Sequence, residues 1–186
     1  MSDIAILKEM IKESARVSLK DGKTKKQVIL NEPEPPDYSV TIDGMPDDDQ
    51  VVVIKADAFT SPQAVFIGSK GECKRADFVI IADTGKKKVI LCIEMKAGKG
   101  GTETEIKEQL KGAKCFVAYC QEIGKLFWNK ENFLKDYEYR FVSIKNIKLN
   151  KKSTGSNPTP RFFSELKILQ RSGSYFQFND LIQCKR

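Results

Sequence analysis

The fold is decided by residues 75–99, which read RADFVIIADTGKKKVILCIEMKAGK. Asp77 comes directly before an apolar run at 78–81, and a second apolar run follows at 89–93. Both runs have the length of a β-strand, and the residues between them, Asp83-Thr84-Gly85, have the composition of a turn. The segment therefore predicts two adjacent strands in a buried hairpin.

The second run leads directly into Glu94-Met95-Lys96. Because side chains alternate along a strand, Glu94 and Lys96 share one face, while Met95 faces away and offers that face only its backbone carbonyl. With Asp77, this gives an all-oxygen ligand set that favours Mg²⁺ or Mn²⁺ over zinc. A lysine beside the ion could orient or deprotonate an attacking water. The alternative is that these residues are ordinary charges at the ends of a buried hairpin.

The pattern of an acid, any residue and a lysine is common, and spacing alone does not identify a site. It occurs four more times in this chain, at Asp21-Gly22-Lys23, Glu72-Cys73-Lys74, Glu105-Ile106-Lys107 and Glu165-Leu166-Lys167. The copy at Glu94 differs in its context, because it ends an apolar run and lies downstream of a second run that begins with an Asp. This context selects Glu94 and Lys96 as the candidates.

Over roughly residues 72–120 the chain resembles the PD-(D/E)xK nuclease superfamily, in an acid at the start of one strand, a Glu-x-Lys at the end of the next, and a following helix that carries Gln109. It departs from the family at Ala76, where the family has proline, and at Ala113, where some branches carry tyrosine. The resemblance implies metal-dependent cleavage of a phosphodiester and a restriction-endonuclease-like fold. It also implies that Gln109 positions Lys96 or a phosphate.

Nucleases of this superfamily often take a further acid from an N-terminal helix. Apolar residues at helical spacing predict a helix over 3–19, and Glu13 falls at the edge of its apolar face. Glu13 is therefore the expected extra acid. The alternative is a solvated glutamate that pairs with Arg16.

A second helix is predicted over 102–123, with a capping box at Thr102 and Gly124 as its stop. Gln109 falls on its apolar face and should point toward the proposed site. A separate basic row consists of Lys107, Lys111 and Lys114, and Lys99 lies in the glycine-rich loop before the helix. We expect these lysines to contact nucleic acid, and the alternative is a solvated lysine face. Further strands are expected at 27–30, 38–42, 50–54, 64–67 and 139–144, with two more within 166–182.

The composition restricts the possible chemistry. The net charge is +7, and because residues 32–54 hold seven acids and no Lys or Arg, the rest of the chain sums to +14. Such a basic excess favours polyanion partners. The chain has no histidine, which excludes Ser/His/Asp and Cys/His triads and histidine-metal nucleases. Its five cysteines are scattered and do not suggest a disulfide framework or a zinc site.

The sequence as a whole predicts one α/β domain over 1–186, with a central mixed sheet, the N-terminal helix on one face and the second helix on the other. The expected function is a Mg²⁺-dependent endonuclease acting on double-stranded DNA, with Mn²⁺ able to substitute. A homodimer would supply the two sites that double-strand cutting needs. No signal segment or apolar run of membrane-spanning length is present, so we expect a soluble, cytoplasmic protein. Two alternatives are a non-cleaving nucleic-acid-binding subunit and an effector that binds a protein through a loop in the acidic segment 32–54.

Overall fold

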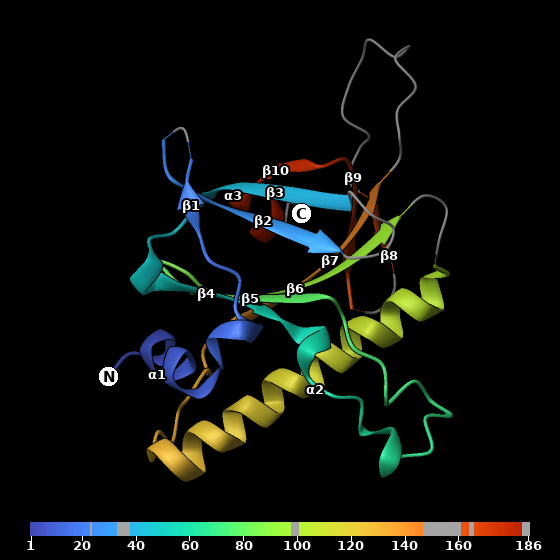
Figure 1. The fold of residues 1–186 in the computed structure, drawn as a ribbon, viewed down its shortest axis with the longest axis horizontal. Helices are drawn as coiled ribbons and strands as arrows, with labels where there is room; N and C mark the ends of the chain where they lie inside the picture. The colour runs from blue at the N-terminus through green and yellow to red at the C-terminus, as the bar shows by residue number, and fades with distance from the viewer. Residues whose placement is uncertain (23, 33–37, 98–100, 147–160, 164–165, 184–186) are drawn as a thin grey trace.

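A six-stranded mixed sheet lies at the centre of the computed structural model, in the strand order β4-β5-β6-β7-β9-β8 (Figure 1). The structure describes residues 1–22, 24–32, 38–97, 101–146, 161–163 and 166–183. Strands β4, β5 and β6 are antiparallel, whereas β6, β7 and β9 run parallel. The strands of this sheet are β4 (Val51–Lys55), β5 (Phe78–Asp83), β6 (Lys88–Ala97), β7 (Glu138–Asn146), β8 (Arg161–Phe163) and β9 (Ile168–Ser172).

A second, four-stranded sheet has the order β1-β2-β3-β10, with β10 parallel to β3. Its strands are β1 (Lys20–Asp21), β2 (Lys26–Glu32), β3 (Tyr38–Met45) and β10 (Tyr175–Gln177). The helices are α1 (Asp3–Met10), α2 (Glu103–Trp128) and α3 (Phe178–Ile182), with short 3-10 turns η1 (Glu13–Ala15), η2 (Asp48–Gln50), η3 (Ala56–Ala58) and η4 (Pro62–Ala64). The chain is thus an α/β domain with two mixed sheets, where one central sheet was expected.

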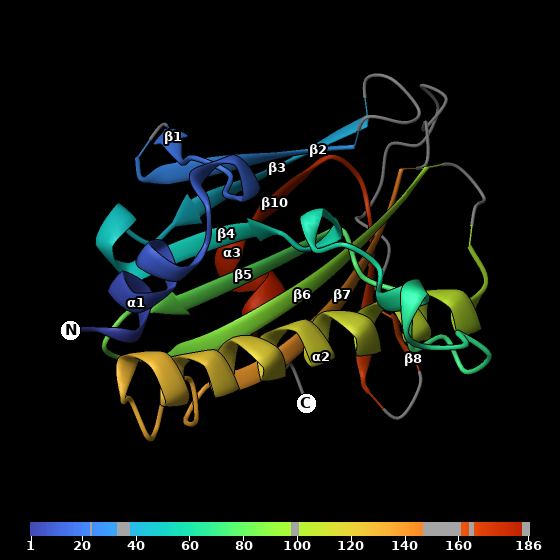
Figure 2. The same cartoon turned by 60° about the horizontal axis from the view of Figure 1, so that its bottom comes forward.

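The central sheet separates two hydrophobic cores. On one face, Val79 and Ile81 of β5 pack with α1 and α2. On the other face, Phe78 and Ile80 pack with β2, β3 and α3. Figure 2 shows α1 and α2 on the same side of the central sheet, opposite the second sheet. The prediction that the two helices cover opposite faces is therefore wrong, because the second sheet and α3 already cover the other face.

The two long helices end at different places from those predicted. Helix α1 ends at Met10 rather than at Leu19, because Arg16 bridges to Ile54 and Val17 donates to the Val53 carbonyl, so the chain turns to follow β4. Helix α2 begins at the predicted capping box but continues through Gly124.

The extension of α2 has a packing cause. A Cβ on Gly124 would lie 2.1 Å from Cδ1 of Phe133, so this glycine gives room to a buried ring within the helix and does not end it. The helix ends instead at Asn129, which has a left-handed backbone conformation with φ of 52°.

Most predicted strands are present, but two regions differ. Residues 64–67 are not a strand: Ala64 ends η4, and residues 65–67 follow in a loop whose apolar side chains are exposed. The two strands expected within 166–182 are β9 and β10, which join different sheets. Within the part of the chain that the structure describes, no helix is both long and apolar enough to span a membrane.

Candidate functional site

The β5–β6 hairpin brings the predicted acids to one end of the central sheet. Phe78 pairs with Ile93, so Asp77 and Glu94 each lie one residue beyond the last pair of the ladder. The alternation of the strands places Met95 in the core under the second sheet and turns Glu94 toward the face that α2 covers. The predicted separation of Glu94 from Met95 is therefore present in the structure.

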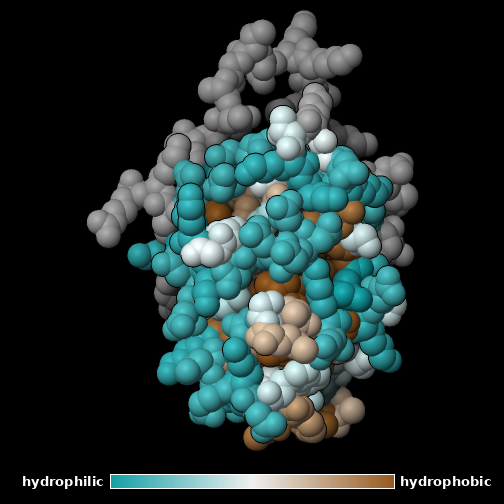
Figure 3. Space-filling model, turned by 90° about the vertical axis from the view of Figure 1, so that its left-hand side faces the viewer, coloured by the Kyte–Doolittle hydropathy of each residue, from teal (hydrophilic) through white to brown (hydrophobic). Residues whose placement is uncertain are grey.

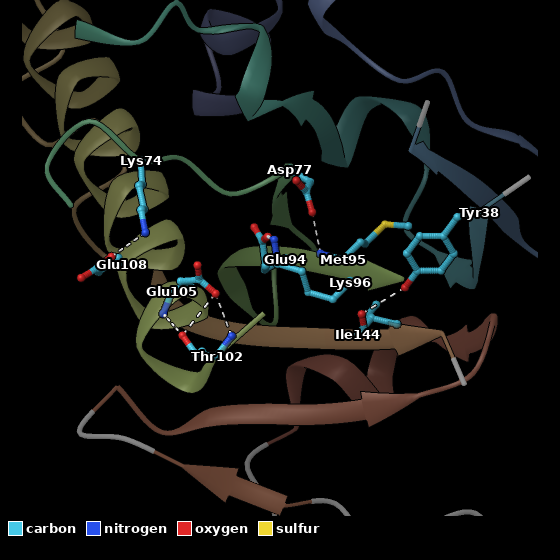
Figure 4. Close-up of polar contacts among 10 residues, drawn as sticks. All are labelled: Tyr38, Lys74, Asp77, Glu94, Met95, Lys96, Thr102, Glu105, Glu108 and Ile144. Atoms are coloured by element: carbon cyan, nitrogen blue, oxygen red, sulfur yellow. Dashed lines mark hydrogen bonds and ion pairs between the residues drawn. The ribbon is translucent and has the colours of Figure 1, made fainter. Parts of the chain in front are cut away.

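Asp77 is held by the backbone of β6. The Met95 N–H donates a 2.6 Å hydrogen bond to Oδ2 of Asp77 (Figure 4). Because the N–H and C=O of a strand residue point to the same edge, the Met95 carbonyl also faces the side on which Asp77 lies. This leaves Oδ1 of Asp77, the Met95 carbonyl and Glu94 as oxygen groups at the end of β5.

Glu94 is fully buried, with 0% of its surface exposed. Its Oε1 lies 2.6 Å from Nζ of Lys96, as an ion pair, but among the described residues neither carboxylate oxygen accepts a hydrogen bond of ordinary geometry. Burial raises the pKa of Glu94 well above its usual range, and the charge of Asp77 raises it further, against the opposing effect of Lys96. A buried carboxylate with so few partners is costly unless a proton or a cation satisfies it.

The site holds further carboxyl groups from outside the hairpin. Burial raises the pKa of Asp77, and the charge of Asp57 in η3 adds to that shift. Burial also raises the pKa of Glu32, at the end of β2, to about 7, and the charges of Asp77 and Asp57 contribute. The sequence reasoning missed Glu32, because only the pairing of the second sheet brings this part of the acidic segment to the end of β6.

Tyr38 closes the same end of the sheet. Its hydroxyl donates a 3.0 Å hydrogen bond to the Ile144 carbonyl of β7, and the ring is buried (Figure 4). Burial raises the pKa of Tyr38 above its usual range, and nearby Asp77 raises it further. Tyr38 therefore stays a neutral hydrogen-bond donor that fastens β3 to the end of the central sheet.

A hollow of about 570 Å³ opens beside these groups. Lys96 and Gln109 both line it, and Oε1 of Gln109 is buried without a hydrogen-bond partner in the described part of the chain. Gln109 and Lys96 of the Glu-x-Lys strand thus border one hollow. The remaining lining residues come from η3, the loop after it, the segment before Asp77 and the start of α2: Asp57, Ser61, Gln63, Cys73, Lys74, Arg75, Gly101 and Glu105.

Close packing against α2 fixes the segment before Asp77. A Cβ on Gly112 would lie 1.8 Å from the Lys74 carbonyl oxygen, so only glycine allows the backbone at Lys74 and Arg75 to approach the helix this closely. The signal in the sequence was a glycine in the interior of a helix with a strong apolar face. The position of Asp77, two residues after Arg75, depends on this contact.

Other predicted residues lie elsewhere. Glu13 is exposed on η1, not on α1, and lines a different hollow with Lys8 and Arg16, so the expected extra acid from the N-terminal helix does not join the site. Lys99 lies outside the described residues. The lysine row follows α2, with Lys107 half-buried, Lys111 exposed, and Nζ of Lys114 5.5 Å from the centroid of the Tyr139 ring.

The oxygen groups at this site suit a small hard cation better than a soft one. Within the described ranges, no three Asp, Glu, His or Cys side chains converge closely enough to hold a metal ion. An ion at this end of β6 would therefore have Asp77, Glu94, the Met95 carbonyl and water as ligands. Mg²⁺ keeps several waters and is often bound through one or two carboxylates, so the donor set fits it.

Comparisons of the chain with protein-family models, with curated proteins and with solved structures found no match. Function is therefore inferred from the groups that β5, β6 and α2 bring together.

Proposed function

We propose that the chain is a Mg²⁺-dependent endonuclease of the PD-(D/E)xK type, with a restriction-endonuclease-like fold, that cleaves DNA duplexes. The observation that carries this proposal is the state of Glu94, which is fully buried, accepts no ordinary hydrogen bond from the described residues, and lies against Lys96 at one end of β6. Structural acids are usually exposed or satisfied by hydrogen bonds, and a costly buried carboxylate beside a hollow marks a candidate functional group.

The residues divide into binding and orienting groups. Asp77, Glu94 and the carbonyl of Met95 would hold the ion, which supplies charge stabilisation for the phosphoryl oxygens when bound. Lys96 lines the hollow, with its ammonium group 2.6 Å from Glu94, and can donate to a water or a phosphate there. Gln109 lines the same hollow and can fix the position of Lys96 by accepting a hydrogen bond from it.

The charge around the hollow favours a phosphodiester substrate. Lys74, Arg75 and Lys96 line it together with the acids Asp57 and Glu105, and α2 carries the lysine row. The chain as a whole has a net charge of +7, despite the acids of residues 32–54. Positive groups around a carboxylate-based cation site would hold a phosphate backbone in place while its ester is cleaved.

A plasmid-nicking assay tests the proposal. Nicking should appear with Mg²⁺ or Mn²⁺, disappear with excess chelator, and be lost in Asp77→Asn. Asp83→Asn is the matched control, because it removes the same charge from the other end of β5, where Asp83 lies 3.7 Å from Lys88 in a partly exposed pair. Full activity in excess chelator, or equal loss in both variants, would overturn the proposed metal mechanism.

A further inference from the structure

An exposed apolar tip lies beside the candidate site. Val65, Phe66 and Ile67 are 79%, 54% and 94% exposed, in consecutive positions after η4. The tip belongs to the loop that connects η3 to β5, and Ser61, Gln63 and Cys73 of this loop line the same hollow as Lys96. Figure 1 shows this loop following the N-terminal half of α2 below the central sheet.

Hydrogen bonds within the loop hold the tip in one shape. The N–H groups of Val65 and Phe66 both donate to the Pro62 carbonyl at 2.9 Å. Beyond the tip, Glu72 accepts from the N–H groups of Gly68 at 2.9 Å and Lys70 at 2.8 Å. The three apolar side chains are thus presented to solvent by a braced turn.

The two ends of the loop are anchored to the rest of the domain. At the start, the Phe59 ring lies 5.4 Å from that of Phe116 and 5.8 Å from that of Tyr119, both on α2. At the end, the Ser61 hydroxyl donates to the Cys73 carbonyl at 3.1 Å and closes the loop. A braced, anchored loop can contact a ligand through its tip without a large ordering cost.

The size and charge of the tip indicate what it contacts. Together the three side chains expose on the order of 400 Å². This is about half of the roughly 800 Å² that each partner buries in a stable protein interface. Lys70 is exposed three residues after the tip, and Lys74 and Arg75 line the hollow. Apolar side chains next to cations match nucleic acid, in which apolar base faces alternate with phosphates.

We propose that Val65, Phe66 and Ile67 contact unstacked bases beside the cleaved phosphate, so that the preferred substrate is duplex DNA with unpaired bases at the cleavage point. This inference rests on the proposed function, because the hollow beside the tip would hold the phosphate. In a fully paired duplex the base faces are stacked on each other, and such side chains gain contact only by separating base pairs, at a cost of a few kcal/mol per step.

The test compares binding to two DNA ligands of matched sequence, a fully paired duplex and the same duplex with a short unpaired bubble. Fluorescence anisotropy in chelator measures affinity without cleavage. The wild-type chain should bind the bubble more tightly. The variant Val65→Ser/Phe66→Ser/Ile67→Ser should lose roughly fivefold to a hundredfold of bubble affinity, the range that base stacking supports, and little affinity for the paired duplex.

A matched control exists at the other end of α2, where Leu126 and Phe127 are 71% and 75% exposed. Figure 3 shows the side of the molecule at which the C-terminal end of α2 lies, with apolar side chains gathered at its lower edge. Leu126→Ser/Phe127→Ser should keep the preference for the bubble. All replaced side chains are exposed, and unchanged melting temperatures would confirm that each variant is folded.

The outcomes separate this inference from the proposed function. If the wild-type chain cleaves DNA but the tip variant keeps its bubble preference, the inference falls and the nuclease stands. If the tip is needed for bubble binding but no cleavage occurs with Mg²⁺, the contact with unpaired bases stands, while the nuclease and the cleavage point fall. If sedimentation shows a dimer that the tip variant breaks, with DNA affinity unchanged, the tip is an interface between copies and the inference falls. No binding to either DNA overturns both.

Discussion

Two copies of the same three-residue pattern, Glu72-x-Lys74 and Glu94-x-Lys96, have opposite surroundings. Glu72 is exposed and accepts from the backbone N–H groups of Gly68 and Lys70, and its own backbone N–H together with these two holds its pKa below the usual range. Lys74 pairs with Glu108 at 2.8 Å. Glu94 is buried, and its pKa is raised because burial and the charge of Asp77 outweigh the opposing effect of Lys96. The surroundings of the acid, and not the pattern, therefore distinguish a candidate site from a structural turn.

A third copy, Glu105-x-Lys107, agrees with this distinction. Glu105 forms the capping box of α2 with Thr102, and these hydrogen bonds lower its pKa. The copies at Asp21 and Glu165 each include a residue outside the described ranges. Of the three copies that the structure describes in full, two have an acid with a structural role, and only Glu94 has an acid without one.

The largest expected effect is on catalysis. Glu94→Gln should lower the nicking rate by about a thousandfold or more, because it removes a charged ligand from the proposed ion. Glu72→Gln removes the same charge from the exposed copy and should stay within about twofold of the wild-type rate. Single-turnover nicking with saturating Mg²⁺ measures both. If Glu72→Gln abolishes activity while Glu94→Gln does not, the site has been assigned to the wrong copy.

The sequence predicted the parts of the site that are local in the chain. The hairpin around Glu94 and the capped helix that carries Gln109 follow from apolar runs, turn residues and caps within about 35 residues. Glu32 could not be predicted, because it reaches the site through the pairing of β2 with β3, and that sheet is completed by β10 from the far end of the chain. Glu13 was assigned to a helix that ends three residues before it.

The next effect is on stability and tests how the segment after Glu72 positions Asp77. Gly112→Ala places a methyl group where the Lys74 carbonyl now lies, so α2 and this segment must move apart. We expect a loss of about 1–3 kcal/mol in the free energy of unfolding, as for other overpacked sites, measured by denaturant unfolding. Nicking should fall as well, because Asp77 follows the displaced backbone.

Gly124 provides a control for that variant. It is also a close-packed glycine of α2, but the ring that contacts it belongs to Phe133, away from the segment before Asp77. Gly124→Ala should destabilise the fold while the protein that remains folded keeps its nicking activity. If Gly112→Ala and Gly124→Ala lose equal nicking activity per folded molecule, Gly112 has no specific effect on the position of Asp77.

Glu94 and Glu72 should contribute to the pH dependence of stability with opposite signs. Burial raises the pKa of Glu94 from 4.5 to about 8, so the folded chain holds a proton that the unfolded chain releases. Its contribution to stability is full below about pH 4.5 and is lost as the pH rises toward about 8. Glu72 has a lowered pKa, so its contribution is present above about pH 4.5 and is lost as the pH falls.

Thermal unfolding in chelator measures this difference. Between about pH 5 and about pH 8, the melting temperature of Glu94→Gln should fall less steeply than that of the wild type. At the upper end of this range, the variant should have the higher melting temperature. Glu72→Gln should lower the melting temperature slightly at neutral pH, with the difference vanishing in acid. A steeper decline for Glu94→Gln than for the wild type would show that Glu94 is charged and satisfied in the folded chain.

The smallest expected effect is on DNA binding and involves Lys107, the lysine of the third copy of the pattern. Lys107, Lys111 and Lys114 follow one side of α2, so replacing all three with Ala should reduce the salt dependence of DNA binding by roughly 0.9 log unit of slope per lost phosphate contact. The matched control is Lys86→Ala/Lys87→Ala/Lys88→Ala, which removes the same charge from the opposite end of β6. If both triple variants reduce the slope equally, DNA is held by diffuse positive charge and α2 has no special place in the interface. If only the α2 variant reduces it, the phosphate backbone follows the helix from which Gln109 lines the hollow.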